Sequence, residues 1–298
     1  MNEREYVITT DTTTDLGVDY YKEHNIPYIR FHYTIDDEEF IQYDEKAHNI
    51  KDFYDLVRKG SMPKTSQASY EDLFGLFESI VKEGKDVFYL CFSGALSGSY
   101  QTSLLAAKDI MEKYPECTVK VVDSLSACGG EGYLLDHCIK RRDQGATLEE
   151  LVEYAEVLRF NTIHLFTVND LNHLHRGGRL SKLSAVVGGM LGIKPILYFN
   201  DKGQLLPYSK VRGRKQSLEA MAKQMKETYI PGENAEIFIN DADAREDAEY
   251  LGKLIKKMIP EVKKIRYGDI GAVIGAHAGP ETVALFYIGK NREPVEIK

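Results

Sequence analysis

The stretch from Cys91 to Tyr114, CFSGALSGSYQTSLLAAKDIMEKY, follows directly on the apolar run DVFYL. The apolar run predicts a buried strand, and the spacing of apolar residues after the Gly/Ser-rich turn predicts a helix. The turn brings the hydroxyls of Ser93, Ser97 and Ser99 to a helix N-terminus, where backbone N–H groups and the helix dipole favour an anion. This unit therefore predicts an anion-binding turn, with a serine that only caps the helix as the simpler alternative.

Nucleotide loops and serine hydrolase motifs do not match this turn. Gly94 and Gly98 enclose too few residues for a Walker-type loop, and no lysine follows the second glycine. The GxGxxG dinucleotide fingerprint is absent, and neither Ser93 nor Ser97 has the flanking glycines of a nucleophile elbow. The anion is therefore not identified by the turn alone.

Composition and charge restrict the class of protein. The chain has 298 residues, of which 43% are hydrophobic and 28% charged, and its formal net charge is −8. These values are typical of a soluble globular protein, and the negative charge argues against binding to nucleic acid or anionic membranes. Four cysteines without a CxxC pair, and no signal peptide or membrane-length apolar run, lead us to expect a cytoplasmic protein without stable membrane insertion.

The order of predicted strands and helices differs between the two halves of the chain, which indicates two domains. In the first half, β-branched runs alternate with amphipathic helices, which predicts a doubly wound parallel sheet. From about residue 166, a hairpin around Asp201-Lys202-Gly203 and further strands around two helices predict an α+β domain. We expect an α/β domain at 1–165 and an α+β domain at 166–298, with a cleft between them. The expected strands are 6–10, 26–35, 86–92, 118–123, 162–168, 235–240, 262–270, 271–278 and 282–288, and the expected helices are 68–84, 98–114, 213–228 and 244–258.

Two further hydroxyl-rich segments precede helical patterns. DTTTDL begins at Asp11 and lacks the second aspartate of a haloacid-type phosphatase, because Thr13 stands at that position. A turn that caps a helix is the better interpretation. In KTSQAS, Ser69 with Asp72 predicts a capping box, which leaves Thr65 free for another role. The eight histidines are scattered, so we expect no metal site.

Basic residues gather in a few turns of this acidic chain. Arg176 and Arg179 flank a Gly-Gly pair, and an apolar helix SAVVGGML is expected after them. The segments KVRGRKQ, which contains Arg212, and GAHAGPET, which contains His277, follow later. Together they predict one positive patch beside a site, although each alone is equally compatible with solvated surface.

Eight segments in this order resemble the DegV family of bacterial fatty-acid-binding proteins over nearly the whole chain. The resemblance implies two α/β domains, the EDD fold, with an acyl chain in a tunnel between them. It implies that Thr65 and Ser93 bind the fatty-acid carboxylate together with His277, while Arg176, Arg212 and Ser97 serve the head-group and partner face. The segments are DTTTDL, KTSQAS, SGALSGSYQTS, VVDSLSACGGEG, NDLNHLHRGGRLS, IKPIL, KVRGRKQ and GAHAGP.

The family resemblance implies a binding protein without catalytic residues, metal or cofactor. Its ligand would be a long-chain fatty acid such as palmitate, stearate or oleate, and some family members present the acid to a separate kinase that makes an acyl-phosphate. A buried carboxylate needs several donors, and a C16 tail contributes roughly 11 kcal/mol at about 0.8 kcal/mol per CH₂. The alternatives are a phosphosugar-type hydrolase or transferase that uses Asp11, Asp123 and Arg176, and a transcription factor or adaptor, which the charge disfavours.

The chain departs from the family pattern at four places, of which DTTTDL for the family's DSTADL is a mild change that keeps the turn chemistry. Gly94 stands where the family has a second serine, and Glu281 stands where it has glycine after the Gly-Pro of GAHAGP. The segment from Asn240 to Asp243 replaces a histidine-containing one. These departures concern the head-group and partner contacts rather than the fold.

Overall fold

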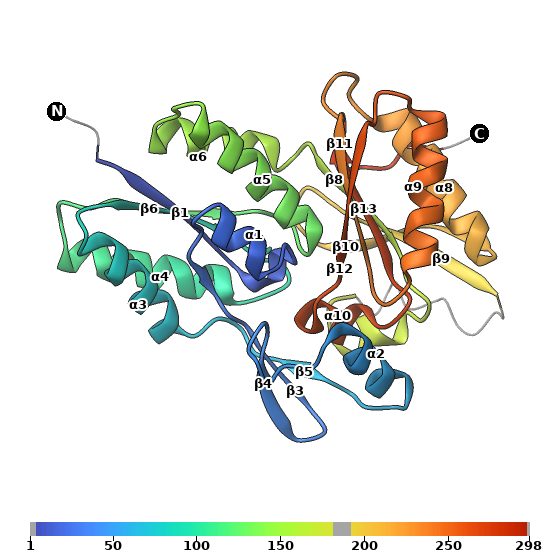
Figure 1. Cartoon of the computed structure of the whole chain (residues 1–298), viewed down its shortest axis with the longest axis horizontal. Coiled ribbons are helices and arrows are strands. Elements are labelled where there is room, and N and C mark those ends of the chain that lie inside the picture. The colour runs from blue at the N-terminus through green and yellow to red at the C-terminus, as the bar shows by residue number, and fades with distance from the viewer. Residues whose placement is uncertain (1–3, 181–191, 297–298) are drawn as a thin grey trace.

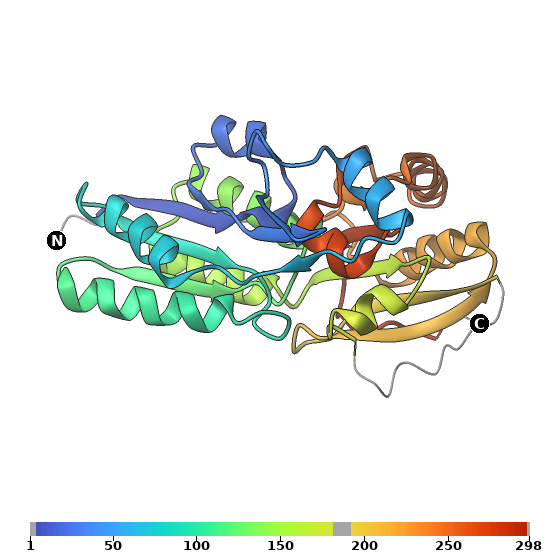
Figure 2. The ribbon, with the colours of Figure 1, turned by 90° about the horizontal axis from the view of Figure 1, so that it is seen from below.

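The computed structural model of this chain describes residues 4–180 and 192–296. Two lobes lie end to end along the long axis (Figure 1 and Figure 2). The apolar helix expected at 184–191 lies outside the described residues.

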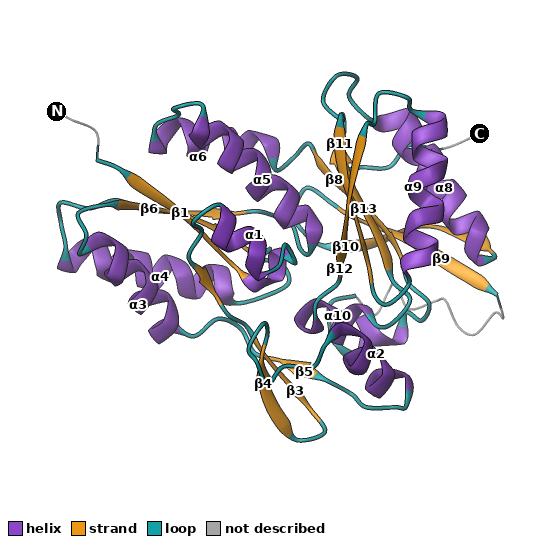
Figure 3. Cartoon of the chain, viewed as in Figure 1, coloured by secondary structure: helices purple, strands orange, loops and turns teal. Residues whose placement is uncertain are grey.

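Helices and strands alternate along most of the chain (Figure 3). The helices are η1 (Thr12–Thr14, a 3₁₀ turn), α1 (Val18–Glu23), α2 (Ile50–Arg58), α3 (Tyr70–Val81), α4 (Ser99–Lys113), α5 (Gly129–Asp143), α6 (Leu148–Leu158), α7 (Asn172–Arg176), α8 (Arg214–Thr228), α9 (Arg245–Met258) and α10 (Ala272–Ala278). The strands are β1 (Tyr6–Asp11), β2 (Tyr28–Ile29), β3 (His32–Ile35), β4 (Glu38–Ile41), β5 (Lys64–Thr65), β6 (Asp86–Cys91), β7 (Val119–Asp123), β8 (Thr162–Thr167), β9 (Ile193–Phe199), β10 (Leu205–Arg212), β11 (Glu236–Asp241), β12 (Lys264–Asp269) and β13 (Val283–Ile288).

The first lobe contains a parallel sheet in the order β2-β1-β6-β7, covered on both faces as its sequence predicts. The central strand β6 is fully buried, because its alternate side chains face two different helix layers. Val87, Tyr89 and Cys91 pack with α3 and α4, whereas Phe88 and Leu90 pack with α5 and α6. The doubly wound arrangement is thereby confirmed.

Side chains cap η1 and α3, but of the capping box predicted at α3 the structure contains only the Ser69 half. The Asp11 side chain accepts a hydrogen bond from the Thr13 backbone N–H at the start of η1. The Ser69 hydroxyl accepts from the Asp72 N–H at the start of α3. Both bonds satisfy backbone donors that a helix start leaves free.

The second lobe contains a mixed sheet in the order β10-β9-β8-β13-β11-β12, in which β11 and β12 form the parallel pair. The hairpin predicted at Asp201-Lys202-Gly203 joins antiparallel β9 and β10, and Gly203 has the positive φ of 71° that the turn requires. Strand β8 already belongs to this sheet, so the expected domain boundary at 165/166 falls within a strand. The domain limits remain a prediction.

One face of the mixed sheet is covered by α8 and α9, and the other faces α5. Helix α5 contacts β6 of the parallel sheet and also β8, β11 and β13. It is therefore shared between the two sheets and fixes their relative position. Figure 1 shows α5 between the two lobes.

A single strand expected at 26–35 is wrong, because this segment divides between two sheets. Strand β2 pairs with β1, whereas β3 belongs to a small antiparallel sheet in the order β4-β3-β5. Between them, the Phe31 N–H donates to the Thr12 hydroxyl and the Phe31 carbonyl accepts from the Gln42 N–H. The carbonyl bond extends the β3–β4 register by one residue, whereas the N–H is used by a side chain outside both sheets, so the two strands part here.

A strand expected at 271–278 is also wrong, because most of this segment is helix α10. Its β-branched residues suggested a strand, but Gly275 N–H donates to the Gly271 carbonyl as in a helix. A Cβ on Gly275 would lie 2.3 Å from the Tyr54 hydroxyl. Tertiary packing that only a glycine-containing helix permits has therefore overridden local propensity.

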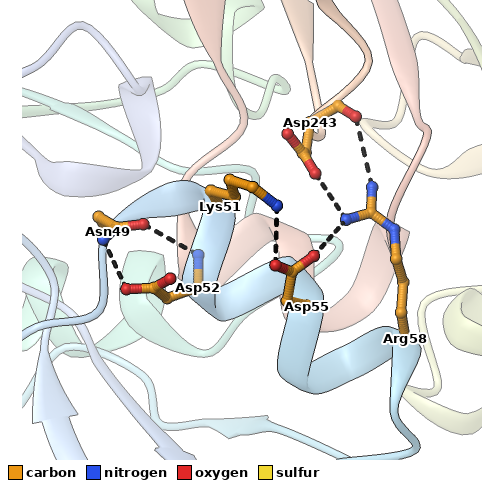
Figure 4. Close-up of polar contacts among 6 residues, drawn as sticks. All are labelled: Asn49, Lys51, Asp52, Asp55, Arg58 and Asp243. Carbon is orange, nitrogen blue, oxygen red and sulfur yellow. Dashed lines mark hydrogen bonds and ion pairs between the residues drawn. The ribbon is translucent and has the colours of Figure 1, made fainter.

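Helix α2 carries part of the first half of the chain onto the second lobe (Figure 4). Tyr54 is fully buried and donates its hydroxyl to the Ile270 carbonyl at 2.8 Å. On the exposed side, Arg58 donates to Asp55 and to the Asp243 carboxylate, 2.5 Å away. The helix thus has a buried aromatic contact and an exposed ionic contact with the same neighbour.

Candidate functional site

An apolar cavity lies where the two sheets, α5 and α10 meet. About 800 Å³ of space between protein atoms, open solvent at its mouth included, lies here. Most of its wall is aliphatic or aromatic, with polar side chains in the minority. The wall is formed by Thr13, Phe31, Thr65, Ser66, Gln67, Phe92, Leu96, Ser97, Ala127, Cys128, His164, Phe166, Leu174, Arg179, Phe199, Leu205, Ile270, Val273, Ile274, His277, Ala278, Thr282, Ala284 and Phe286.

Two of the residues expected to bind the carboxylate meet at this cavity. Thr65 ends β5, where Tyr33 of β3 pairs with it, and His277 lies on α10. A hydrogen bond of 2.8 Å joins Thr65 Oγ1 to His277 Nε2, although 212 residues separate them in the chain. The small sheet and α10 therefore build one polar corner from distant segments.

The His277 imidazole is held neutral at this corner. Burial, together with the nearby Arg179 guanidinium, lowers the pKa of His277 to about 4. Its buried Nδ1 has no hydrogen-bond partner in the described part of the chain. A Cβ on Gly177 would lie 2.2 Å from Nδ1, so the glycine of the HRGGR turn makes room for this ring.

A basic hollow on the outside shares the same corner. Thr65, His277 and Arg179 line both the cavity and this hollow, so they form the boundary between apolar interior and solvent. The Arg179 side chain is held by the Leu96 and Gly177 carbonyls, at 3.2 and 2.6 Å. The hollow, hereafter the outer hollow, is lined by Met62, Pro63, Lys64, Thr65, His173, Arg176, Gly177, Arg179, Ala276 and His277.

The serines of the Gly/Ser turn are placed differently from each other. Ser97 lines the cavity and its hydroxyl is 2.9 Å from that of Ser99. Ser93 is completely buried, is not among the cavity-lining residues, and donates its hydroxyl to the Gly203 carbonyl at 3.0 Å. The structure thus brings Thr65, Ser97 and His277 to one cavity, whereas the Ser93 hydroxyl serves the β9–β10 turn.

The two arginines of the expected partner face also differ. Arg176 is exposed, lines the outer hollow and donates to His173 Nδ1. Arg212 is exposed at the end of β10 and lines neither the cavity nor the outer hollow. The positive patch around the site is therefore formed by Arg176, Arg179 and Lys64.

The departures from the family pattern lie around the cavity rather than in its wall. The Gly94 N–H donates to the Asp123 carboxylate at 3.2 Å, and a Cβ on Gly94 would lie 2.9 Å from Asp123 Oδ2. Asn240 donates to the Asp269 carbonyl. The exposed Glu281 does not line the cavity.

Buried acids lie behind one wall of the cavity. The Thr13 hydroxyl, on the wall itself, contacts the carboxyl groups of Asp11 and Glu131. Burial raises the pKa of Asp11 to about 6 and of Asp15 to about 7, and burial with the neighbouring Asp11 raises that of Glu131 further above its usual value. Negative charge is thus unfavourable on this side, whereas the opening is basic.

Sequence reasoning missed the aromatic end of the cavity. Phe166, Phe199 and Phe286 come from three neighbouring strands of the mixed sheet, and His164 lies 4.4 Å from Phe199 and 5.0 Å from Phe286 between ring centroids. The sequence signal that could have indicated this end was the alternation of side chains along β8, which places His164 and Phe166 on the same face of the sheet. Their common cavity depended on which strands became neighbours.

Within residues 4–180 and 192–296, no three histidine, cysteine, aspartate or glutamate side chains are arranged to hold a metal ion. Over the same residues, none of the helices has the length and apolar character required to cross a bilayer.

Comparison with known proteins identifies the family. The model of the family described as "uncharacterised protein, DegV family" matches residues 5–290, and the chain belongs to the DegV family. A DegV domain-containing protein of Clostridium perfringens is 38% identical over 291 residues, which cover 98% of this chain and 100% of that protein. One from Lactococcus lactis is 33% identical, with coverage of 97% and 99%.

Solved structures share the same fold. A fatty-acid-binding DegV family protein of Streptococcus agalactiae has a TM-score of 0.84 at 29% identity, covering 97% of this chain and 100% of that one. A DegV lipid-binding protein of Thermotoga maritima has a TM-score of 0.81 at 28% identity, with coverage of 97% and 100%. A DegV family protein of Thermus thermophilus, described for its fatty-acid binding, has a TM-score of 0.86 at 25% identity, with coverage of 96% and 99%.

Proposed function

We propose that this protein binds one long-chain fatty acid, with the acyl chain in the cavity and the carboxylate at the corner formed by Thr65 and His277. The observation that carries the proposal is the cavity itself, which is mainly apolar and meets a basic outer hollow at Thr65, His277 and Arg179. The fatty-acid and lipid binding described for structural relatives from Streptococcus agalactiae and Thermotoga maritima supports it.

The cavity wall suits the tail of such a ligand. Each methylene transferred from water to an apolar wall contributes about 0.8 kcal/mol, so a C16–C18 chain supplies roughly 11–14 kcal/mol before the costs of binding. Palmitate, stearate and oleate all fall in this range. No catalytic step is needed for affinity of this size, and we propose a binding protein without cofactor.

The corner suits a carboxylate rather than a neutral group. With the Thr65–His277 hydrogen bond in place, the pair has one proton left to donate: the Thr65 hydroxyl proton where Nε2 donates to Thr65, or Nδ1–H where Nε2 accepts from it. The Arg179 guanidinium lies on the same boundary. Charge-assisted hydrogen bonds to a buried carboxylate are stronger than neutral ones. The Ser93 hydroxyl would have to leave the Gly203 carbonyl to take part, so we assign the larger contribution to Thr65 and His277.

The outer hollow suits contact with a kinase after the fatty acid has bound. We propose that Arg176 contacts a kinase or the phosphoryl group that the kinase transfers, with Ser97 inside the opening and Arg212 as a more peripheral contact. A planar guanidinium offers several fixed donors to phosphate. The protein would thus present the acid without carrying out the chemistry.

The test begins with lipid extracted from the purified protein and identified by mass spectrometry, followed by calorimetric titration of the delipidated protein with stearate. Thr65→Val, which keeps the β-branched shape, should weaken binding by about 1.5–3 kcal/mol. Thr34→Val is the matched control, because Thr34 lies on β3 of the same small sheet and does not line the cavity. Absence of extracted fatty acid together with absence of stearate binding would refute the proposal.

Charge reversal separates binding from presentation. Arg176→Glu should leave stearate affinity nearly unchanged and slow acyl-phosphate formation by a cognate kinase, because the tail supplies most of the affinity. Arg212→Glu should have a smaller effect on the kinase rate, since Arg212 lies outside the outer hollow. Equal kinase rates in Arg176→Glu and the parent would remove Arg176 from the partner face.

A further inference from the structure

His164 and Arg292 meet at the Ser126 hydroxyl. The Ser126 hydroxyl oxygen lies 3.0 Å from His164 Nε2 and 3.2 Å from a guanidinium nitrogen of Arg292. A guanidinium can only donate, so Ser126 accepts from Arg292. The hydroxyl keeps one proton and one further lone pair. Donation of that proton to His164 Nε2 gives it an acceptor and puts the proton of a neutral His164 on Nδ1, which is the tautomer that the proposal below uses.

Several features hold this imidazole neutral and in place. Only 2% of its surface is exposed, and burial, followed by the nearby Arg292 charge, lowers the pKa of His164 well below its usual value. The ring packs on Phe199 and Phe286. A Cβ on Gly130 would lie 2.0 Å from His164 Cε1, so the start of α5 lies against the Cε1 edge of the ring.

The fixed ring forms part of the ligand cavity. His164 is a wall residue, and no hydrogen bond from its Nδ1 to another described residue is present. A polar N–H without a partner is costly in a mainly apolar wall. A ligand atom that accepts this hydrogen bond would remove the cost.

His164 lies away from the carboxylate corner. The Thr282 hydroxyl, just before β13, donates to the Ala278 carbonyl at the end of α10. His164 pairs with Phe286, four residues further along the chain than Thr282, which is roughly 13 Å at the rise of an extended strand. A ligand held at Thr65 and His277 would therefore meet His164 with the middle or far part of its chain.

We propose that His164 Nδ1–H is a second polar anchor in the cavity, and that it binds an acceptor oxygen carried by the acyl chain away from the carboxylate. The ligand class is an oxygenated long-chain fatty acid, such as a keto or hydroxy acid. This inference rests on the proposed fatty-acid function and adds a specificity to the same cavity.

The first test compares stearate with its 10-keto and 12-keto derivatives in calorimetric titrations of the delipidated protein. In the parent, at least one keto acid should bind as tightly as stearate or more tightly. In His164→Phe, which keeps an aromatic ring, the preference for that keto acid over stearate should fall by about 3- to 10-fold. His137→Phe is the control, since His137 is another largely buried histidine that does not line this cavity.

Stearate binding tests the proposed fatty-acid function. The ratio of keto-acid affinity to stearate affinity tests the His164 anchor, so either can be refuted without the other. If both keto acids bind the parent at least tenfold more weakly than stearate, or if His164→Phe leaves the ratio unchanged, the anchor does not exist. Should His164→Phe not fold, ¹⁵N NMR of the parent still decides: Nδ1 must carry the proton at neutral pH. A proton on Nε2 would overturn the proposal.

Discussion

The two faces of the six-stranded sheet come from the same strands, but one is packed solidly against helices and the other borders a cavity. On one face, side chains such as Leu165, Leu285 and Ile239 pack fully against α8 and α9. On the other, Phe166 and Phe286 meet α5 and α10 around a cavity. Alternation along a strand supplies two apolar faces, and the packing of the covering helices decides which face becomes solid core and which can hold a ligand.

The sharpest test of this comparison is one substitution made on each face. Leu251→Ala in α9 removes a fully buried side chain from the packed face and should lower the free energy of unfolding by about 2–5 kcal/mol. Leu205→Ala on the cavity wall should cost less, because Leu205 already borders empty space and has fewer contacts to lose. Urea denaturation of both variants measures the difference.

For stearate binding, the cavity-wall variant Leu205→Ala should show the larger effect of the two. Stearate affinity should change several-fold in Leu205→Ala and stay within error in Leu251→Ala. Equal destabilisation of the two variants, with no change in either affinity, would mean that the cavity face is packed as tightly as the helix-covered face.

The next largest effect is a pH dependence of stability that comes from the buried carboxyl group of Asp15. Burial raises the pKa of Asp15 to about 7 from 3.8, and Gln42 donates to this carboxylate. Between these two pH values the folded state binds more protons than the unfolded state, so this group stabilises the fold progressively as pH falls from about 8 to about 4. Asp15→Asn should therefore be more stable than the parent at pH 8, on the order of 2–4 kcal/mol.

The gain in Asp15→Asn should shrink towards pH 4, where the folded parent is already protonated. Denaturant midpoints at pH 8, 6 and 4 provide the measurement. A constant difference across this range would show that Asp15 titrates normally, and that the substitution acts through packing.

A smaller effect is expected from the glycine that faces His277. Gly177→Ala places a methyl group about where His277 Nδ1 lies, since the Cβ would be 2.2 Å from that atom. The displaced ring should weaken stearate binding by roughly tenfold, or about 1.4 kcal/mol, with little change in stability. Gly75→Ala on α3, where a Cβ meets nothing within 4 Å, is the control. Unchanged affinity in Gly177→Ala would remove His277 from the carboxylate corner.

The smallest effect concerns how α2 is held over the second lobe. Arg58→Ala breaks the partly exposed contacts with Asp55 and Asp243 (Figure 4), and such pairs contribute about 0–1 kcal/mol. Tyr54 and Phe53, which are fully buried, should keep α2 in place, so thermal unfolding and stearate affinity should change little. A loss well above 1 kcal/mol would show that the ionic contact, rather than the aromatic one, attaches α2.

The sequence by itself determined the parts of this protein that depend on local periodicity and capping. The continuous apolar run at 86–91 predicted the buried strand β6, the Ser69 cap placed the start of α3, and the turn at Gly203 predicted the β9–β10 hairpin. The ordered family segments also led to the correct fold and to Thr65 as a cavity residue.

Tertiary structure decided what depends on contacts between distant residues. Segment 271–278 is mostly helix, and its Gly275 leaves room for the Tyr54 hydroxyl. The Ser93 hydroxyl donates to the Gly203 carbonyl in the other lobe. The Thr65–His277 pair spans 212 residues, and Ser126 joins His164 to Arg292, which lies 128 positions further along the chain. Periodicity shows which side of an element is apolar, but it does not show which elements meet, because that choice depends on the packing of the whole chain.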